Sequence, residues 1–345
     1  MVETLSSVHQ TVSNALRQAG FDNPRRQAAE LVCGLLKRPL ADLYRYPDDP
    51  VNDEQAGNLL EAADKRAQGI PLVYLTGRTF FFDRSFIIHP GVLIPRSDSE
   101  VLVETALSCL LENRFSVGGN AVKCRAVPDS QADHLLHVSP AGKDAACSNV
   151  QSDAWPLAAC GFERRGAEQE IKILDLCTGS GCIGISIAAE LQKRGFEVSL
   201  MMTDIDEAAL ACAAENITLH QLEQHAMLQK ADLFPEQEQA YDLITANPPY
   251  IPTGDIGCLS PEVRLHEPLQ ALDGGEDGLL FYRRLISKAQ YYMRSGSLIL
   301  LEHGWHQADD VIELLKQQAC FADLHVCADY GGQERVSGGY MKYLA

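Results

Sequence analysis

The part of the chain that follows residue 170 alternates short apolar runs with helical segments, and no other feature of the sequence restricts the fold as much. Apolar runs with the length of buried strands occupy residues 171–176, 198–203, 241–246 and 298–302. Segments of helical character lie between them, near residues 182–193, 207–220 and 279–293. This alternation is typical of a doubly wound, mostly parallel sheet with helices on its faces. We therefore predict an α/β fold for this part of the chain.

The N-terminal part of the chain shows helical periodicity only. Apolar residues recur at helical spacing in 8–19 and in 28–36. A third helical segment, over 53–68, ends at Gly69, and glycine is favoured directly after a helix. We predict a small helical domain over residues 1–75.

Two segments connect or interrupt these domains. Alternating and aromatic residues in 76–96 predict a β-hairpin that links the helical domain to an α/β domain over 97–345. A helix is expected over 97–111. The segment 115–169 is rich in Gly, Ala, Ser, Pro and Asp and has no sustained period. We interpret it as a flexible insertion.

Charge and cysteine content restrict the possible partners and the compartment. The chain has 47 acidic and 29 basic residues, a formal net charge of −18, which disfavours direct nucleic-acid binding because such binding rests on Lys and Arg. The 11 cysteines include no Cys-x-x-Cys pair, which fits neither a disulfide framework nor a structural zinc site. The N-terminus is polar, and no apolar run approaches membrane-spanning length. We expect a cytoplasmic protein that makes no membrane contact.

A turn of small residues follows the first predicted strand. Gly179 and Gly181 lack a Cβ, so their backbone N–H groups can approach an anionic ligand at the start of the next helix. Gly184 completes the spacing of a dinucleotide fingerprint. The turn alone therefore leaves a nicotinamide cofactor, or no ligand at all, as alternatives.

Two acidic residues add to this pattern. Asp204 ends the second predicted strand, where a carboxylate can accept both ribose hydroxyls of an adenosine. Asp232 follows the segment expected to form the third strand, where a carboxylate can accept a hydrogen bond from an adenine amino group. The alternative is that both carboxylates cap helices or lie in solvent.

The sequence Asn247-Pro248-Pro249-Tyr250 follows the strand predicted over 241–246. Two prolines stiffen a strand end and remove two N–H donors, so carbonyl groups and the Asn247 amide oxygen remain as acceptors on a rigid frame. Such a frame suits an NH2 group, whose nitrogen must be held and aimed at an electrophilic methyl group. The alternative is a structural Asn-Pro turn.

With these motifs the chain resembles the HemK/PrmC family, the glutamine methyltransferases of peptide chain release factors. The resemblance covers nearly the whole chain except the insertion. Besides the glycine turn and the Asn247–Tyr250 motif, the blocks that carry it are 69–77, 93–96, 267–268, 271–278, 301–304 and 329–335.

The resemblance implies a class I, Rossmann-like methyltransferase domain with a seven-stranded, mostly parallel sheet, and an N-terminal helical domain that docks the substrate. It implies S-adenosyl-L-methionine as the cofactor and the glutamine of the Gly-Gly-Gln motif in class I release factors as the substrate. The implied cofactor-binding residues are Cys177, Thr178, Gly179, Ser180, Gly181, Asp204, Asp232, Leu233 and Asn247. The implied substrate-holding residues are Asn247, Pro248, Pro249 and Tyr250.

Some positions depart from the family pattern and keep other substrates open. Cys177 stands where glycine is common, and Ser97 where proline is usual, as in sister enzymes that methylate a ribosomal protein. The further alternatives are a DNA or RNA amino-methyltransferase and a non-catalytic adaptor of a translation factor. His303 and His306 are interpreted as packed residues, and we expect no metal because sulfonium methyl transfer needs no Lewis acid.

Overall fold

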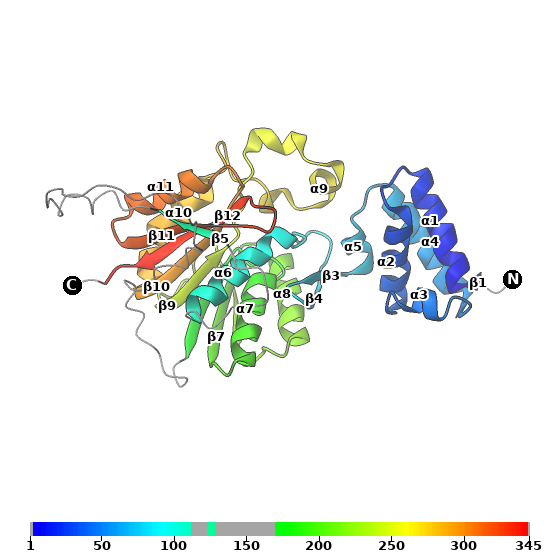
Figure 1. Cartoon of the computed structure of the whole chain (residues 1–345), viewed down its shortest axis with the longest axis horizontal. Coiled ribbons are helices and arrows are strands. Elements are labelled where there is room, and N and C mark those ends of the chain that lie inside the picture. The colour runs from blue at the N-terminus through cyan, green and yellow to red at the C-terminus, as the bar shows by residue number, and fades with distance from the viewer. Residues whose placement is uncertain (1–2, 112–122, 128–169, 344–345) are drawn as a thin grey trace, which may run out of the picture.

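The computed structural model describes residues 3–111, 123–127 and 170–343, which form a helical domain and an α/β domain joined by a β-hairpin (Figure 1). No helix in these ranges is long and apolar enough to cross a membrane. The class predicted from the sequence, an α/β domain with a small helical domain, is confirmed.

The helical domain packs its helices around one apolar core. Its helices are α1 (Leu5–Gln18), α2 (Pro24–Leu36), α3 (Asp42–Arg45), α4 (Asp53–Ala67) and α5 (Leu72–Thr76). A short antiparallel pair, β1 (Glu3–Thr4) and β2 (Pro50–Val51), ties its start to the chain before α4. Leu5, Leu16, Leu31 and Leu59 are almost fully buried in this core. The predicted third helix is confirmed within a residue, and Gly69 beyond it adopts a positive φ of 94°.

The hairpin predicted between the domains consists of β3 (Arg78–Phe81) and β4 (Arg84–Ile87). Asn216, on helix α8 (Glu207–Leu219), holds it against the α/β domain. The Asn216 amide accepts from Ile87 N–H at 2.7 Å and donates to the Ile87 carbonyl at 2.9 Å. The same amide donates to the Ser180 carbonyl at 2.9 Å, in the glycine turn. One fully buried side chain thus joins the hairpin to that turn.

The α/β domain contains a sheet of eight strands in the order β5-β11-β12-β10-β9-β6-β7-β8. Strands β8, β7, β6, β9 and β10 pair in parallel, whereas β12 pairs antiparallel with both its neighbours. The bounds are β6 (Ile171–Leu176), β7 (Val198–Asp204), β8 (Ala226–Lys230), β9 (Tyr241–Ala246), β10 (Met293–Glu302), β11 (Phe321–Ala328) and β12 (Glu334–Met341). The strands predicted over 171–176 and 241–246 are therefore confirmed.

Helices cover both faces of this sheet. One apolar core packs α6 (Glu100–Leu110), α7 (Cys182–Lys193) and part of α8 against it. The other packs α10 (Leu280–Ala289) and α11 (Ala308–Gln317). The remaining helical segments are short: η1 (Ser97–Ser99), η3 (Thr253–Cys258), α9 (Pro261–His266), η4 (Leu269–Ala271) and η5 (Gln290–Tyr292).

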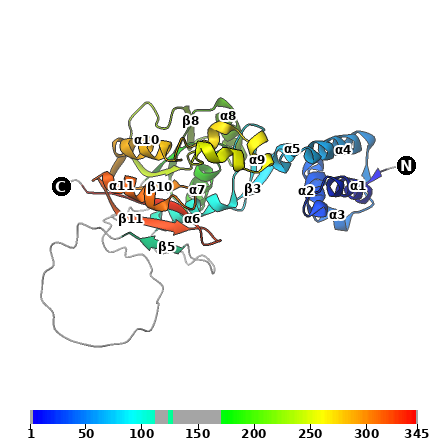
Figure 2. The ribbon, with the colours of Figure 1, turned by 90° about the horizontal axis from the view of Figure 1, so that it is seen from above.

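The sheet has one strand more than the seven expected, and the extra strand comes from the segment interpreted as an insertion. Strand β5 (Lys123–Ala126) pairs antiparallel with β11 at the edge of the sheet (Figure 2). A disulfide joins Cys124 to Cys327 across this pair, which corrects the expectation that the cysteines form no disulfide. The partners are 203 residues apart, so spacing in the sequence gave no signal. Residues 112–122 and 128–169 of the segment lie outside the described residues.

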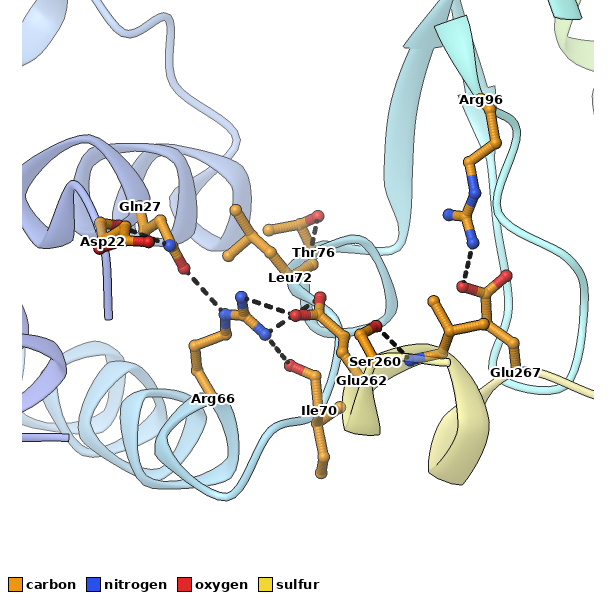
Figure 3. A network of polar contacts seen from close by, with 11 residues as sticks. Asp22, Gln27, Arg66, Ile70, Leu72, Thr76, Arg96, Ser260, Glu262 and Glu267 are labelled. Atoms are coloured by element: carbon orange, nitrogen blue, oxygen red, sulfur yellow. Dashed lines mark hydrogen bonds and ion pairs between the residues drawn. The ribbon is translucent and has the colours of Figure 1, made fainter. Parts of the chain in front are cut away.

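Arg66, near the end of α4, joins the helical domain to α9 (Figure 3). Its guanidinium, with the side chain only 6% exposed, lies 3.2 Å from the Glu262 carboxylate on α9. It also donates to Gln27 Oε1 at 3.0 Å and to the Ile70 carbonyl at 2.9 Å. The ring of Phe21 stacks below it at 4.3 Å. Both views of the ribbon place α9 next to α5, on the side that faces the helical domain.

We predict that Asn216→Ala lowers the free energy of unfolding by about 2–4 kcal/mol, because it removes the hydrogen-bond partner of the Ile87 N–H and of the Ser180 carbonyl, whereas the Ile87 carbonyl keeps the Cys212 thiol as a donor. Urea unfolding of the full-length chain measures the change. Asn14→Ala is the control, because Asn14 is exposed on α1, and we expect it to change stability by less than about 0.5 kcal/mol. Equal effects of the two substitutions would contradict the anchoring role of Asn216.

Candidate active site

The order of the strands places two loops side by side. The chain runs outward from β6 to β7 and β8 and then returns to β9 on the other side of β6. At this reversal Leu176, the last residue of β6, pairs with Ala246, the last residue of β9. The turn that follows β6 and the Asn247–Tyr250 loop that follows β9 therefore begin next to each other. Such a reversal point is where open α/β sheets bind their ligands.

Two adjacent cavities, of about 230 Å³ and about 220 Å³, open between these loops. They share the lining residues Leu93, Cys177, Gly179, Asn247 and Ala271. The first is also lined by Thr178, Ser180, Tyr250, Ser99, Arg96 and Glu302. The second is also lined by Asp204, Asp232, Leu233, Pro249, Phe281 and Arg284. We call them the inner cavity and the outer cavity.

Most of the predicted site residues therefore line one cavity or both. Gly181 and Pro248 are the exceptions, because neither belongs to the lining. Gly181 has a φ of 81° and precedes α7, where it completes the turn, and Pro248 is buried beneath the loop. Gly181 thus shapes the backbone path of the turn, and the backbone carbonyl is the group of Pro248 that remains for a ligand.

The side chain of Asp175, near the end of β6, fixes the position of the glycine turn. Its carboxylate accepts from the Thr178 hydroxyl at 2.6 Å and from the Thr245 hydroxyl at 2.7 Å, so it links β6, the turn and β9. Burial raises the pKa of Asp175 to about 6. A Cβ on Gly184 would lie 3.0 Å from the Asp175 carboxylate oxygen and Cβ. Gly184, which had suggested a dinucleotide fingerprint, thus allows α7 to pack closely on β6.

Asp204, at the end of β7, projects into the outer cavity. Its carboxylate accepts from Gly179 N–H at 2.8 Å and from Asp206 N–H at 3.0 Å. Burial raises the pKa of Asp204, and these backbone donors oppose the rise. Each carboxylate oxygen can accept more than one hydrogen bond, so capacity remains for a ligand. The alternative that Asp204 lies in solvent does not agree with this geometry.

Asp232 is placed differently, at the rim of the outer cavity. Its side chain is 55% exposed and pairs with Arg284 of α10 at 2.6 Å. Leu233 and Phe281 add apolar side chains to the lining of the outer cavity. Sequence reasoning did not single out Arg284 or Phe281, because their positions on an ordinary amphipathic helix give no local signal.

The Asn247–Tyr250 loop is fixed by contacts with other elements. The Tyr250 carbonyl accepts from Gln307 Nε2 at 3.0 Å, and burial raises the pKa of the Tyr250 phenol to about 12. Asn247 Nδ2 donates to the Ser99 hydroxyl at 3.3 Å, and that hydroxyl donates to Glu302 Oε1 at 2.9 Å. Sequence reasoning missed Ser99 altogether. It noted Glu302 only as part of a family block.

His303 does not reach the cavities. It is fully buried, and its Nε2 lies 2.8 Å from the Ser337 hydroxyl. Burial lowers the pKa of His303 to about 4, which keeps the ring neutral. Within the described ranges no group of three or more His, Cys, Asp and Glu side chains lies close enough to hold a metal ion.

Comparison with known proteins agrees with this geometry. The family models of the PrmC N-terminal domain and of the methyltransferase small domain match residues 7–77 and 162–257. The release factor glutamine methyltransferase of Moorella thermoacetica is 32% identical over 344 residues, which covers 97% of this chain and 99% of that protein. The enzyme of Thermodesulfovibrio yellowstonii with this name is 32% identical, and the alignment covers 90% of this chain and 90% of that protein. The enzyme of Geobacter sulfurreducens is 30% identical, and the alignment covers 97% of this chain and 96% of that protein. The resemblance seen in the sequence is thereby confirmed: the chain belongs to the release factor glutamine methyltransferase family, whose members are S-adenosylmethionine-dependent enzymes.

Proposed function

We propose that this enzyme methylates the side-chain amide nitrogen of the glutamine in the Gly-Gly-Gln motif of class I peptide chain release factors, in the cytoplasm. The observation that carries the proposal is the position of Asn247. It lines both cavities, so one amide can contact a ligand in the outer cavity and a second ligand in the inner one. The names of the relatives point to the same substrate.

The outer cavity fits the adenosine part of S-adenosylmethionine. A partly buried carboxylate, Asp204, lines this cavity together with the apolar side chains of Leu233 and Phe281, which suits a ribose beside an aromatic base. We assign Asp204 to the ribose hydroxyls, Asp232 and Leu233 to the adenine, and the turn from Cys177 to Gly181 to the methionine part. When bound, this group supplies an electrophilic methyl carried by a sulfonium.

The inner cavity fits a planar amide. An amide nitrogen is a poor nucleophile because its lone pair is delocalised, so the site must hold both N–H groups and direct the nitrogen at the methyl carbon. We assign this task to the Asn247 side-chain oxygen and the Pro248 carbonyl, with Pro249 and Tyr250 fixing and covering the loop. The product cation sheds its proton readily to water, and we assign no general base.

A folded protein partner is supported by the surroundings of the inner cavity. Leu259 and Val263, on the segment that contains η3 and α9, line it. Leu265 and Leu269 of the same segment are 65% and 58% exposed. This segment also receives the ion pair from Arg66 of the helical domain. We therefore propose that the helical domain, residues 1–75, docks the release factor while the segment 253–271 borders its glutamine.

We predict that Asn247→Ala lowers kcat by at least about 100-fold and leaves the affinity for S-adenosylmethionine within about threefold, because the lost acceptor orients the nucleophile. Calorimetric titration gives the affinity, and mass spectrometry of a recombinant release factor gives both the rate and the methylated residue. Wild-type turnover in this variant would rule out the assignment. Methylation of a ribosomal protein, RNA or DNA instead of the release factor would replace the proposed substrate.

We predict that Glu262→Gln, which breaks the ion pair between α9 and the helical domain, lowers kcat/KM several-fold on the intact release factor but not on a short Gly-Gly-Gln peptide. The reason is that only a folded partner contacts both domains at once. Glu30→Gln is the matched control, because it breaks the Arg26–Glu30 pair within α2. Equal losses on protein and peptide would contradict a docking role for the helical domain.

A further inference from the structure

Glu302, the last residue of β10, is a buried carboxylate. It is 2% exposed and lines the inner cavity. Its Oε1 accepts a hydrogen bond from Ser99, whereas its Oε2 has no hydrogen-bond partner among the described residues. A buried carboxylate with one oxygen unpaired costs free energy, so its position needs an explanation other than stability.

Ser99 connects Glu302 to the Asn247 amide. The hydroxyl is 2% exposed and comes from η1, at the start of α6, so three separate elements meet at this point. The hydroxyl donates to Glu302 Oε1 at 2.9 Å and accepts from Asn247 Nδ2 at 3.3 Å. A hydroxyl can donate only one hydrogen bond. Because Ser99 donates to the Glu302 carboxylate, it can interact with Asn247 only as an acceptor.

When Glu302 is ionised, it determines which groups donate and which accept in the hydrogen bonds that link it to Ser99 and Asn247. An ionised Glu302 can only accept, so Ser99 must donate to it and must accept from the amide of Asn247. The Nδ2 group of Asn247 then faces Ser99, and Oδ1 remains for an N–H group of the substrate. We infer that Glu302 and Ser99 are positioning residues that hold the Asn247 amide in the orientation required to bind the substrate amide. The inference rests on the proposed function of Asn247.

A protonated or amidated residue at position 302 could no longer enforce this direction. Either form can donate to Ser99, which would release the Ser99 proton toward Asn247 Oδ1 and favour the flipped amide. A flipped Asn247 would present two N–H donors to a substrate that also brings N–H donors. The catalytic arrangement would then lose an acceptor at the reacting nitrogen.

The surroundings of Glu302 shift its protonation to a pH at which the enzyme can be assayed. Burial raises the pKa of Glu302 to about 7, while Ser99, Arg335 and Asn247 oppose the rise and Asp98 adds to it. The other titratable groups that interact with it are Tyr250, Tyr282 and Cys182, whose own pKa values burial raises, so these remain neutral near pH 7. As the pH falls through about 7, Glu302 takes up a proton and the fraction of correctly oriented Asn247 falls.

The test compares Glu302→Gln and Ser99→Ala with the wild-type enzyme and with a matched control. Glu104→Gln is that control: Glu104 also has a pKa raised by burial and a buried oxygen without a partner, but it binds Tyr330 and does not line either cavity. We expect kcat to fall about tenfold or more in Glu302→Gln and in Ser99→Ala, with S-adenosylmethionine affinity within about threefold of wild type. Glu104→Gln should keep the wild-type rate.

The pH profile and a double-mutant comparison separate positioning from a structural role. Wild-type kcat/KM should fall below about pH 7, whereas Glu302→Gln should show a lower kcat/KM without this acidic limb. In an Asn247→Ala background, Glu302→Gln should have no further effect, because the amide it orients is gone. The temperature of thermal unfolding at pH 8 should be unchanged or higher in Glu302→Gln. The pKa of Glu302 is raised from 4.5 to about 7 in the folded enzyme, so stability falls as the pH rises between these values and the full penalty is present at pH 8.

The inference is overturned if Glu302→Gln keeps the wild-type rate, if its effect persists in the Asn247→Ala background, or if its main effect is on cofactor affinity. Failure of the proposed function has a different signature, because the wild-type enzyme itself would then transfer no methyl group to the release factor. On any amide substrate that the wild type does methylate, the comparison of variants still tests the orientation of Asn247.

Discussion

The site depends on the parallel pairing of β6 with β9 at the centre of the sheet. This pairing sets Leu176 beside Ala246, and each strand then releases a loop at the same edge. Asp175 reinforces the junction, because one buried carboxylate accepts from Thr178 of the turn and from Thr245 of β9. Any shift in register would separate the turn from Asn247, so the cavities follow from strand pairing before any side chain contacts a ligand.

How much the sequence could predict depends on the distance between the partners along the chain. Apolar runs and glycine turns are local signals, and they predicted β6, β9, α7 and the position of Asn247 correctly. Strand β5 was missed because an edge strand of four residues, Lys-Cys-Arg-Ala, has neither the length nor the apolar content of a buried strand. Its partner β11 lies about two hundred residues away, and no local pattern records that pairing.

The same limit explains which site residues the motifs did not reveal. Ser99 and Glu302 lie 203 residues apart, and Ser99 contacts both Glu302 and Asn247 only because η1, β10 and the loop after β9 converge. Their chemistry also depends on burial, which raises the pKa of Glu302 to about 7. The exposed Asp232 carries the same functional group, but it pairs with Arg284 at the rim. Identical carboxylates thus acquire different roles from their environment, which residue type alone does not indicate.

The short helix α9 contacts the helical domain and also contributes to the lining of the inner cavity. On one side Glu262 contacts Arg66, and on the other Glu267 pairs with Arg96 and accepts from Ile94 N–H at 3.3 Å. Both carboxylates belong to a segment whose Val263 lines the cavity. Because the Glu267 side chain is almost fully buried, its contacts resist screening by solvent, whereas Glu262 is partly exposed and holds more weakly. The Glu267 contacts therefore fix the end of α9 to the chain that precedes α6 more firmly than the Arg66–Glu262 pair fixes α9 to the helical domain.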